Sequence, residues 1–94
     1  AGGISLSLSE RLVKVDQEPI QLSYKEFELL KVLMEHPGEV FTRQWLYERI
    51  WNGIYSEKNR TVDIHVQTLR KKLGTCGSLI ESVKYIGYRM KKVP

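Results

Sequence analysis

The stretch RTVDIHVQTLRKKL, residues 60–73, has the two-faced pattern of an amphipathic helix. Its apolar residues recur at helical spacing and fall on one narrow stripe: Val62, Val66, Leu69 and Leu73. Gly74 and Gly77 follow directly and end the pattern. We predict a helix over about residues 59–73, with this stripe facing the core.

The opposite face of the same helix is polar except for one isoleucine. It carries Arg60, Ile64, Gln67, Thr68 and Lys71. An isolated exposed isoleucine is common, but beside an amide and a hydroxyl it suits a surface that meets a thymine methyl group while its neighbours bond to base edges. We predict that Ile64, Gln67, Thr68 and Lys71 face the bases of a DNA major groove.

Further side chains of this helix are placed to reach the phosphates on the walls of such a groove: Thr61, His65, Arg70 and Lys72. His65 is equally suited to fill space beside the core. Asp63 is the only acidic residue of the helix. It either accepts a hydrogen bond from a cytosine amino group or holds Gln67 or Arg70 on its own helix.

The N-terminal third of the chain predicts a small sheet followed by a helix. Residues 4–22 alternate apolar and polar positions in short pieces separated by turns, which indicates an antiparallel meander. Ser23 and Glu26 then form a capping box, so we expect a helix to begin at Ser23. Pro37 and Gly38 end this helix after His36.

A second helix is predicted from the cap residue Thr42 to about Ile50, after a short strand or extended link at Val40 and Phe41. Trp51 follows it, and its ring is expected to cover the core while its indole N–H reaches a phosphate. The turn-rich residues 52–59 separate this helix from the third.

The C-terminus predicts a basic hairpin. Residues 79–84 and 87–92 read as two strands joined at a turn around Tyr85, Ile86 and Gly87. From residue 84 onward the hairpin has no acidic residue and carries Lys84, Arg89, Lys91 and Lys92. Lysines protect many edge strands against aggregation, but a basic hairpin tip also enters minor grooves. The predicted class is α+β: a winged helix-turn-helix with an N-terminal antiparallel sheet, three helices and a C-terminal β-hairpin wing.

Charge and length restrict the classes of function. Ninety-four residues suit one domain, which we place at residues 4–94, with residues 1–3 as a linker or cloning remnant. Residues 1–57 carry six Lys/Arg and nine Asp/Glu, whereas residues 58–94 carry nine and two. The positive field therefore belongs to the predicted third helix and hairpin. It indicates a polyanionic partner, although a solvated surface has the same composition.

Other classes find no support in the sequence. No apolar run is long enough for a membrane span. Residues 1–3 have neither a basic nor an apolar region of the kind found in a signal peptide, so we expect no export. The single cysteine, Cys76, has no Cys or His neighbour at metal-ligand spacing and fits a reducing cytoplasm. No catalytic motif is present. We expect no enzymatic activity, no metal and no cofactor.

Several motifs, in a fixed order, resemble one known family. They are EFELL at 26–30, HPG-x-VFTR at 36–43, IW at 50–51, RTVDIHV at 60–66 with LRKKL at 69–73, and GYR at 87–89. Together they are similar to the OmpR/PhoB class of winged-helix effector domains, which lie at the C-terminus of bacterial two-component response regulators. The similarity covers about residues 4–91.

This resemblance implies a sheet of three or four N-terminal strands and identifies the third helix as the recognition helix. It implies base-facing positions at Ile64, Gln67 and Thr68. It implies phosphate contacts from Arg43, Trp51, Arg60, Thr61, His65 and Arg70. It implies wing contacts from Ser82, Lys84 and Tyr88, to which the basic pattern adds Arg89. The loop at residues 52–58 contacts RNA polymerase in such proteins, which gives exposed Ile54 and Tyr55 a role.

The departures from the family bear on specificity. Gln67 and Thr68 stand where many relatives are strongly basic, so the base preference should differ. Tyr85 stands at the wing tip where glycine is common, and Asn52 replaces the usual glycine after Trp51. No phospho-acceptor receiver domain is present, so we expect a piece of a longer, phosphorylation-controlled regulator.

Two hypotheses follow for the function. The first is sequence-specific binding of double-stranded DNA for transcription regulation, as two domains side by side on tandem half-sites. The second is a winged-helix protein-interaction module whose basic surface meets an acidic partner or RNA polymerase, with Ile54 and Tyr55 as its contact residues.

Overall fold

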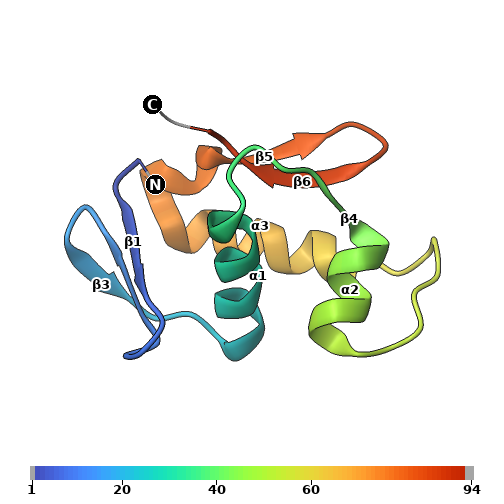
Figure 1. The fold of residues 1–94 in the computed structure, drawn as a ribbon, viewed down its shortest axis with the longest axis horizontal. Coiled ribbons are helices and arrows are strands. Elements are labelled where there is room, and N and C mark those ends of the chain that lie inside the picture. The colour runs from blue at the N-terminus through green and yellow to red at the C-terminus, as the bar shows by residue number, and fades with distance from the viewer. Residues whose placement is uncertain (1, 93–94) are drawn as a thin grey trace.

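The computed structural model describes residues 2–92; Ala1, expected in the linker, and residues 93–94, expected in the domain, lie outside the described residues. The described residues form three α-helices and two antiparallel sheets (Figure 1). In this view the N-terminal sheet lies at one end of the molecule beside α1, and the C-terminal hairpin runs along the upper edge. The α+β winged-helix class predicted from the sequence is confirmed.

The N-terminal sheet has three short strands in the order β1-β2-β3. These are β1 (Ile4–Ser7), β2 (Leu12–Val15) and β3 (Glu18–Ile20). The predicted alternation holds, because Ile4 and Val13 are buried in the core while Lys14 is exposed. Gly3, expected in the linker, packs on this sheet, since its carbonyl accepts a hydrogen bond from the Asp16 N–H at 2.8 Å.

Helix α1 (Tyr24–Glu35) begins at the predicted capping box. The Ser23 hydroxyl accepts from the Glu26 N–H at 3.2 Å, and the Glu26 carboxylate accepts from the Ser23 N–H at 2.8 Å. Both bonds satisfy amide groups that the first turn of a helix leaves without partners. The buried face of α1 includes Phe27, Leu29, Leu30 and Leu33, so this helix supplies the centre of the core.

Helix α2 (Arg43–Trp51) and helix α3 (Thr61–Leu73) pack on α1. The Thr42 hydroxyl caps α2 by accepting from the Trp45 N–H at 3.0 Å. The predicted core stripe of α3 is fully buried: Val62, Val66, Leu69 and Leu73. Helix α3 begins at Thr61, with Arg60 at the N-cap position, slightly later than the predicted start at about residue 59. The Asn59 side chain accepts from the Thr61 N–H at 2.9 Å, a local bond that competes with the helix and leaves Asn59 outside it.

The C-terminal sheet joins the hairpin to the start of α2. Its order is β4-β6-β5, with β4 (Phe41–Thr42), β5 (Ile80–Val83) and β6 (Gly87–Met90). Both hairpin strands are shorter than the predicted 79–84 and 87–92. The residues before them form a 3-10 helix, η1 (Gly74–Leu79), which the sequence did not indicate.

Gly87 is the position where β6 passes closest to β4. A Cβ atom at Gly87 would lie 1.9 Å from the carbonyl oxygen of Phe41. We predict that Gly87→Ala lowers the free energy of unfolding by at least about 2 kcal/mol, measured by urea denaturation. Gly53→Ala is the matched control, because its Cβ would meet only the Tyr47 side chain, at 3.1 Å. It should cost less than about 1 kcal/mol, and equal losses in the two variants would contradict the prediction.

Candidate nucleic-acid interface

The predicted base-facing residues share one exposed face of α3. Ile64, Gln67 and Lys71 are exposed, and Ile64 is 58% accessible although it is apolar. Thr68 is half-buried, and its hydroxyl donates to the Ile64 carbonyl at 3.1 Å. This hydroxyl retains its acceptor capacity. The face therefore offers a methyl-bearing side chain, an amide, a hydroxyl acceptor and an ammonium group within two turns of helix.

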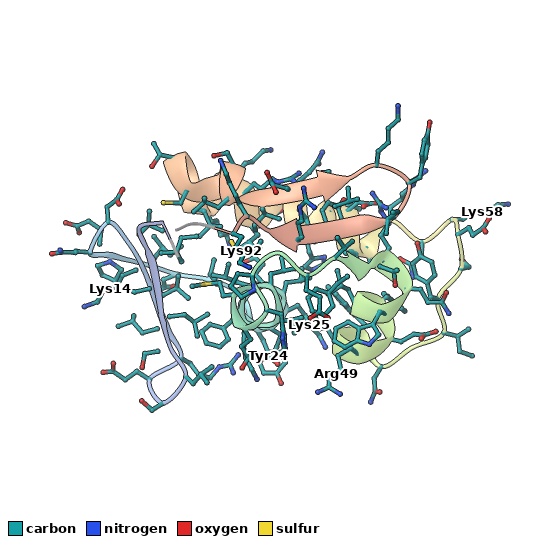
Figure 2. The ribbon with its side chains drawn as sticks, turned by 45° about the horizontal axis from the view of Figure 1, so that its top comes forward. Lys14, Tyr24, Lys25, Arg49, Lys58 and Lys92 are labelled. Carbon is teal, nitrogen blue, oxygen red and sulfur yellow. The ribbon has the colours of Figure 1, made fainter. Side chains whose placement is uncertain are left out.

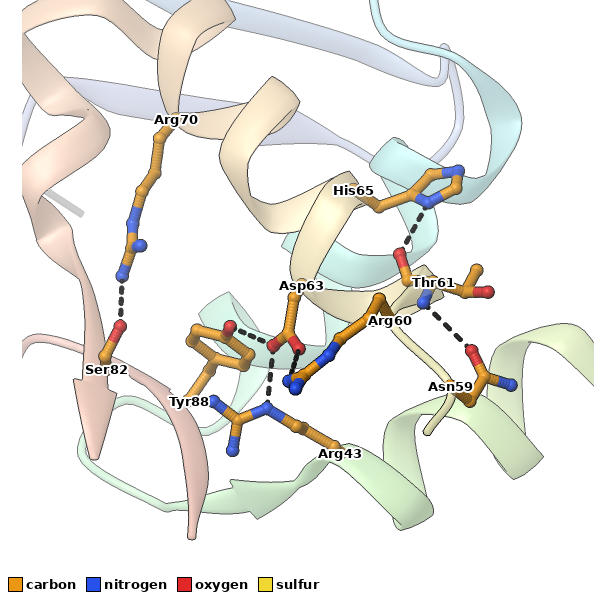
Figure 3. A network of polar contacts seen from close by, with 9 residues as sticks. All are labelled: Arg43, Asn59, Arg60, Thr61, Asp63, His65, Arg70, Ser82 and Tyr88. Atoms are coloured by element: carbon orange, nitrogen blue, oxygen red, sulfur yellow. Dashed lines mark hydrogen bonds and ion pairs between the residues drawn. The ribbon is translucent and has the colours of Figure 1, made fainter. Parts of the chain in front are cut away.

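Asp63 lies beside this face and binds three residues from outside its own helix (Figure 3). Its Oδ1 accepts from the Arg43 Nε–H of α2 at 2.7 Å and from the Tyr88 hydroxyl of β6. Its Oδ2 pairs with Arg60 Nη1 at 3.5 Å. The expectation that Asp63 holds Gln67 or Arg70 on its own helix is therefore wrong, because the partners come from α2, β6 and the residue before α3.

The shifts in pKa favour an ionised Asp63, a charged Arg43 and a neutral Tyr88 at neutral pH. Burial by itself raises the pKa of the Asp63 carboxyl group, but hydrogen bonds from Tyr88 and Arg43 and the charge of Arg43 outweigh it, so the pKa is lowered. Burial and Asp63 raise the pKa of the Tyr88 hydroxyl. The hydrogen bond to Asp63 raises the pKa of Arg43. A carboxylate thus faces two guanidinium groups and a neutral phenol.

Arg70 ties the hairpin to α3. Its guanidinium group donates to the Ile80 carbonyl from Nε at 3.0 Å and from Nη2 at 2.6 Å, and Nη2 also donates to the Ser82 hydroxyl at 3.0 Å (Figure 3). Ser82 itself is exposed. The predicted phosphate contact of Arg70 stays a prediction, and it would come from a side chain that already holds β5.

Two other predicted DNA contacts are also engaged within the domain. Lys72 donates to the Glu26 carboxylate at 2.7 Å, and Glu26 is only 4% exposed. Burial raises the pKa of Glu26, but the bonds from Lys72 and Ser23 outweigh it, so the pKa is lowered. Tyr88, expected on the wing surface, is 5% exposed and faces Asp63 instead. Burial leaves Tyr88 little surface for a partner.

His65, Thr61 and Trp51 surround the start of α3. The Nδ1 atom of His65 lies 2.8 Å from the Thr61 carbonyl oxygen. The ring of His65 meets the edge of Trp51 at a centroid distance of 4.8 Å. His65 therefore occupies the boundary position that was the alternative to a phosphate contact. Trp51 packs partly buried against the core, as predicted, and stacks on Tyr47.

The loop between α2 and α3 exposes one of its two predicted contact residues. Ile54 is 95% exposed. Tyr55 is half-buried and tilts onto Tyr47 at a centroid distance of 6.0 Å, so the expectation of an exposed Tyr55 is wrong. Tyr47 lies on α2, where it contacts both Trp51 and Tyr55. The one sequence signal for this aromatic cluster is that Tyr47 and Trp51 are four residues apart on the same helix.

The wing adds cations and apolar groups. Lys84 is exposed at the tip, with its ammonium nitrogen 5.2 Å from the ring centroid of Tyr85. Arg89 pairs with Glu81 across the hairpin at 3.0 Å. Tyr85 and Ile86 are exposed. Figure 2 places Lys14, on the N-terminal sheet, at the opposite end of the molecule from Lys58 in the loop before α3.

No group of three or more His, Cys, Asp or Glu side chains among residues 2–92 is placed to hold a metal ion. Within the same range, no helix has the length and apolarity that crossing a membrane requires.

The sequence of the chain is similar to those of known transcriptional regulators. Residues 17–90 match the family model described as "Transcriptional regulatory protein, C terminal". The chain is 41% identical to the sensory transduction protein RegX3 of Mycolicibacterium smegmatis over 78% of its length and 32% of that protein. It is 35% identical to the phosphate regulon transcriptional regulatory protein PhoB of Escherichia coli over 93% of its length and 39% of that protein. The chain thus spans between 32% and 39% of the length of these relatives.

A solved structure has the same fold. The RstA DNA-binding domain of Klebsiella pneumoniae, in complex with the RstA box, superimposes with a TM-score of 0.87 at 29% identity. The superposition covers 96% of this chain and 92% of that one.

Acid should weaken the cluster around Asp63. Because the pKa values of Asp63 and Glu26 are lowered in the folded chain, their contribution to stability is full above the carboxyl pKa of the unfolded chain. It is lost as the pH falls through the lowered folded values, so we predict that stability decreases below about pH 4. Asp63→Asn should lower the free energy of unfolding at pH 7 by about 1–3 kcal/mol.

The same variant should flatten the loss of stability in acid, because its side chain no longer takes up a proton on unfolding. Urea denaturation at pH 7 and at acid pH measures both effects. Glu57→Gln, at an exposed position of the loop before α3, is the control and should leave both values near wild type. An unchanged acid slope in Asp63→Asn would contradict the assignment.

Proposed function

The chain belongs to the family of C-terminal domains of transcriptional regulatory proteins, and from this premise we propose that it binds double-stranded DNA sequence-specifically to regulate transcription. The observation that carries this proposal is the exposed face of α3, where Ile64, Gln67 and Lys71 stand together without a partner among the described residues. The DNA complex of the similar RstA domain supports it.

In this proposal α3 lies in the major groove and the β5–β6 wing meets the adjacent minor groove. Ile64, Gln67, Thr68 and Lys71 read base edges. Phosphates on either side are met by Arg43 at the start of α2, by Arg60 and Thr61 at the start of α3, and by Lys84 on the wing. Trp51, His65, Arg70, Lys72, Tyr88 and Arg89 take part mainly by holding the elements in place.

The chain acts as the output domain of a phosphorylation-controlled response regulator. The similarity to the sensory transduction protein RegX3 and to the transcriptional regulatory protein PhoB, of which the chain spans 32% and 39%, supports this. Two copies bind side by side on tandem half-sites about one helical turn apart. Sites selected from a random duplex library would reveal the repeat and its spacing.

Charge and base reading should separate in binding experiments. Lys71→Ala combined with Lys84→Ala should weaken binding to every duplex, because both substitutions remove positive charge near the DNA. The slope of log affinity against log salt should fall by about one, because only Lys84 is proposed to meet a phosphate. Lys14→Ala is the matched control, because this lysine is exposed on the N-terminal sheet, far from Lys58 in Figure 2. Fluorescence anisotropy of a labelled duplex at several salt concentrations measures both. Unchanged binding in the double variant would refute the proposal.

Gln67→Ala should instead change the base preference at one position of the site. Loss of one good base contact costs about 1–3 kcal/mol for the preferred duplex and little for a duplex mutated at that position. Selection from random duplexes with both proteins compares their preferences. If both select the same site with the same strength, Gln67 is not a base contact.

We further propose that the loop before α3 contacts RNA polymerase through Ile54, whose 95% exposure favours a protein partner over a packing role. Ile54→Ala should leave DNA affinity unchanged and reduce transcription by purified bacterial RNA polymerase from a promoter with the selected site. Leu8→Ala, also at an exposed apolar position, is the control. If the wild-type chain binds no DNA but still binds RNA polymerase, its function is that of a protein-interaction module and not of a DNA-binding domain. Equal transcription with Ile54→Ala and wild type would remove the polymerase contact.

A further inference from the structure

The tip of the β5–β6 hairpin exposes two large apolar side chains. Tyr85 is 90% exposed and Ile86 is 50% exposed. The Tyr85 ring lies next to the ammonium group of Lys84, whose nitrogen is 5.2 Å from the ring centroid. Exposed aromatic and aliphatic groups side by side at a loop tip are typical of surfaces that a partner covers.

The backbone at the tip is held in an unfavourable conformation to present these groups. The turn closes with the Ile86 N–H donating to the Val83 carbonyl at 2.9 Å, and Tyr85 has a φ of +67°. Glycine and asparagine favour this left-handed region, whereas a bulky aromatic residue is strained there. The ring of Tyr85 gains no burial in return. Strain without compensating packing indicates that the side chain is used for something else.

The tip is rigidly placed relative to α3. Arg70 holds β5 through Ser82, and Tyr88 of β6 holds the first turn of α3 through Asp63. The hairpin therefore lies along α3, with its tip beyond the end where the helix begins. Figure 1 shows the turn projecting at that end of the molecule. A helix seated in a major groove would carry the tip towards the neighbouring minor groove.

From this placement we infer that Tyr85 and Ile86 form an apolar wedge that enters the DNA minor groove, with Lys84 meeting the adjacent phosphate. The inference rests on the proposed DNA binding and adds a second specificity-determining element to it. The walls of the minor groove are deoxyribose C–H groups, which suit an aromatic ring and a branched aliphatic side chain. Its floor accepts such a wedge most readily at A·T pairs, because the guanine amino group projects into the groove at G·C pairs.

The first test uses a substitution that relieves the backbone strain while it removes the ring. Tyr85→Gly should leave the melting temperature equal or higher, yet weaken binding to the selected duplex by about tenfold. Gln17→Gly is the matched control, because Gln17 has a φ of +73° in an exposed turn of the N-terminal sheet. It should affect stability in the same direction and leave binding unchanged. Tyr85→Phe keeps the ring and should bind like wild type.

The second test locates the groove. A·T pairs flanking the selected site are replaced in turn by G·C or by inosine·C, which has the major-groove edge of G·C without the minor-groove amino group. Wild type should bind the inosine duplex several-fold more tightly than the G·C duplex at the wing position. Tyr85→Gly should lose this difference.

The wedge and the proposed DNA binding can fail separately. Unchanged affinity in Tyr85→Gly overturns the wedge. Weakened binding with the inosine preference retained overturns it as well, because the tip then contacts something other than the minor groove. If Lys71→Ala, Lys84→Ala weakens binding while Tyr85→Gly does not, DNA binding stands and only the wedge fails. If wild type binds no duplex, the wedge and the proposed function both fail.

Discussion

One carboxylate holds the elements of the candidate interface together. Asp63 belongs to α3, yet it receives Arg43 from α2 and Tyr88 from β6. Hydrogen bonds to a partly buried charge are stronger than those between neutral groups, and their loss leaves charged partners unpaired. Without Asp63, Arg43 and Arg60 would face each other with no anion between them. The exposed face of α3 and the wing therefore keep a fixed relation, because both are attached to this residue.

The same kind of pairing limits how much of the positive charge is free. Asp63 neutralises part of the Arg43 and Arg60 charge, Glu26 binds Lys72, and Glu81 binds Arg89. Affinity for DNA from counterion release grows with the number of cations that meet phosphates. When several cations are paired within the domain, fewer remain to meet phosphates. The affinity for DNA then depends more on contacts with the bases. The mixed face around Ile64, Gln67 and Thr68 supplies groups of that kind.

Local pattern was enough to predict the helices and the core, but not the contacts between elements. The capping box at Ser23 and the stripe from Val62 to Leu73 depend on residues three or four positions apart, and the structure confirms both. Asp63 lies 20 residues from Arg43 and 25 from Tyr88, and Lys72 lies 46 from Glu26. Helical periodicity reports only neighbours on one helix. Periodicity therefore predicted that Asp63 binds residues of its own helix and that Lys72 reaches a phosphate. In the fold, Asp63 binds Arg43 and Tyr88, and Lys72 binds Glu26.

The contacts between elements fix the relative positions of two exposed apolar side chains. Ile64 lies on the free face of α3 and Tyr85 at the wing tip, and each exposes apolar surface to water at a cost. Arg70, Asp63 and Gly87 fix the distance between the two sites, since they tie β5 and β6 to α3 and to β4. A partner that covers both side chains must present two complementary sites at that separation. The major and minor grooves of duplex DNA lie side by side at a regular spacing, and this is the geometry that the proposed binding mode requires.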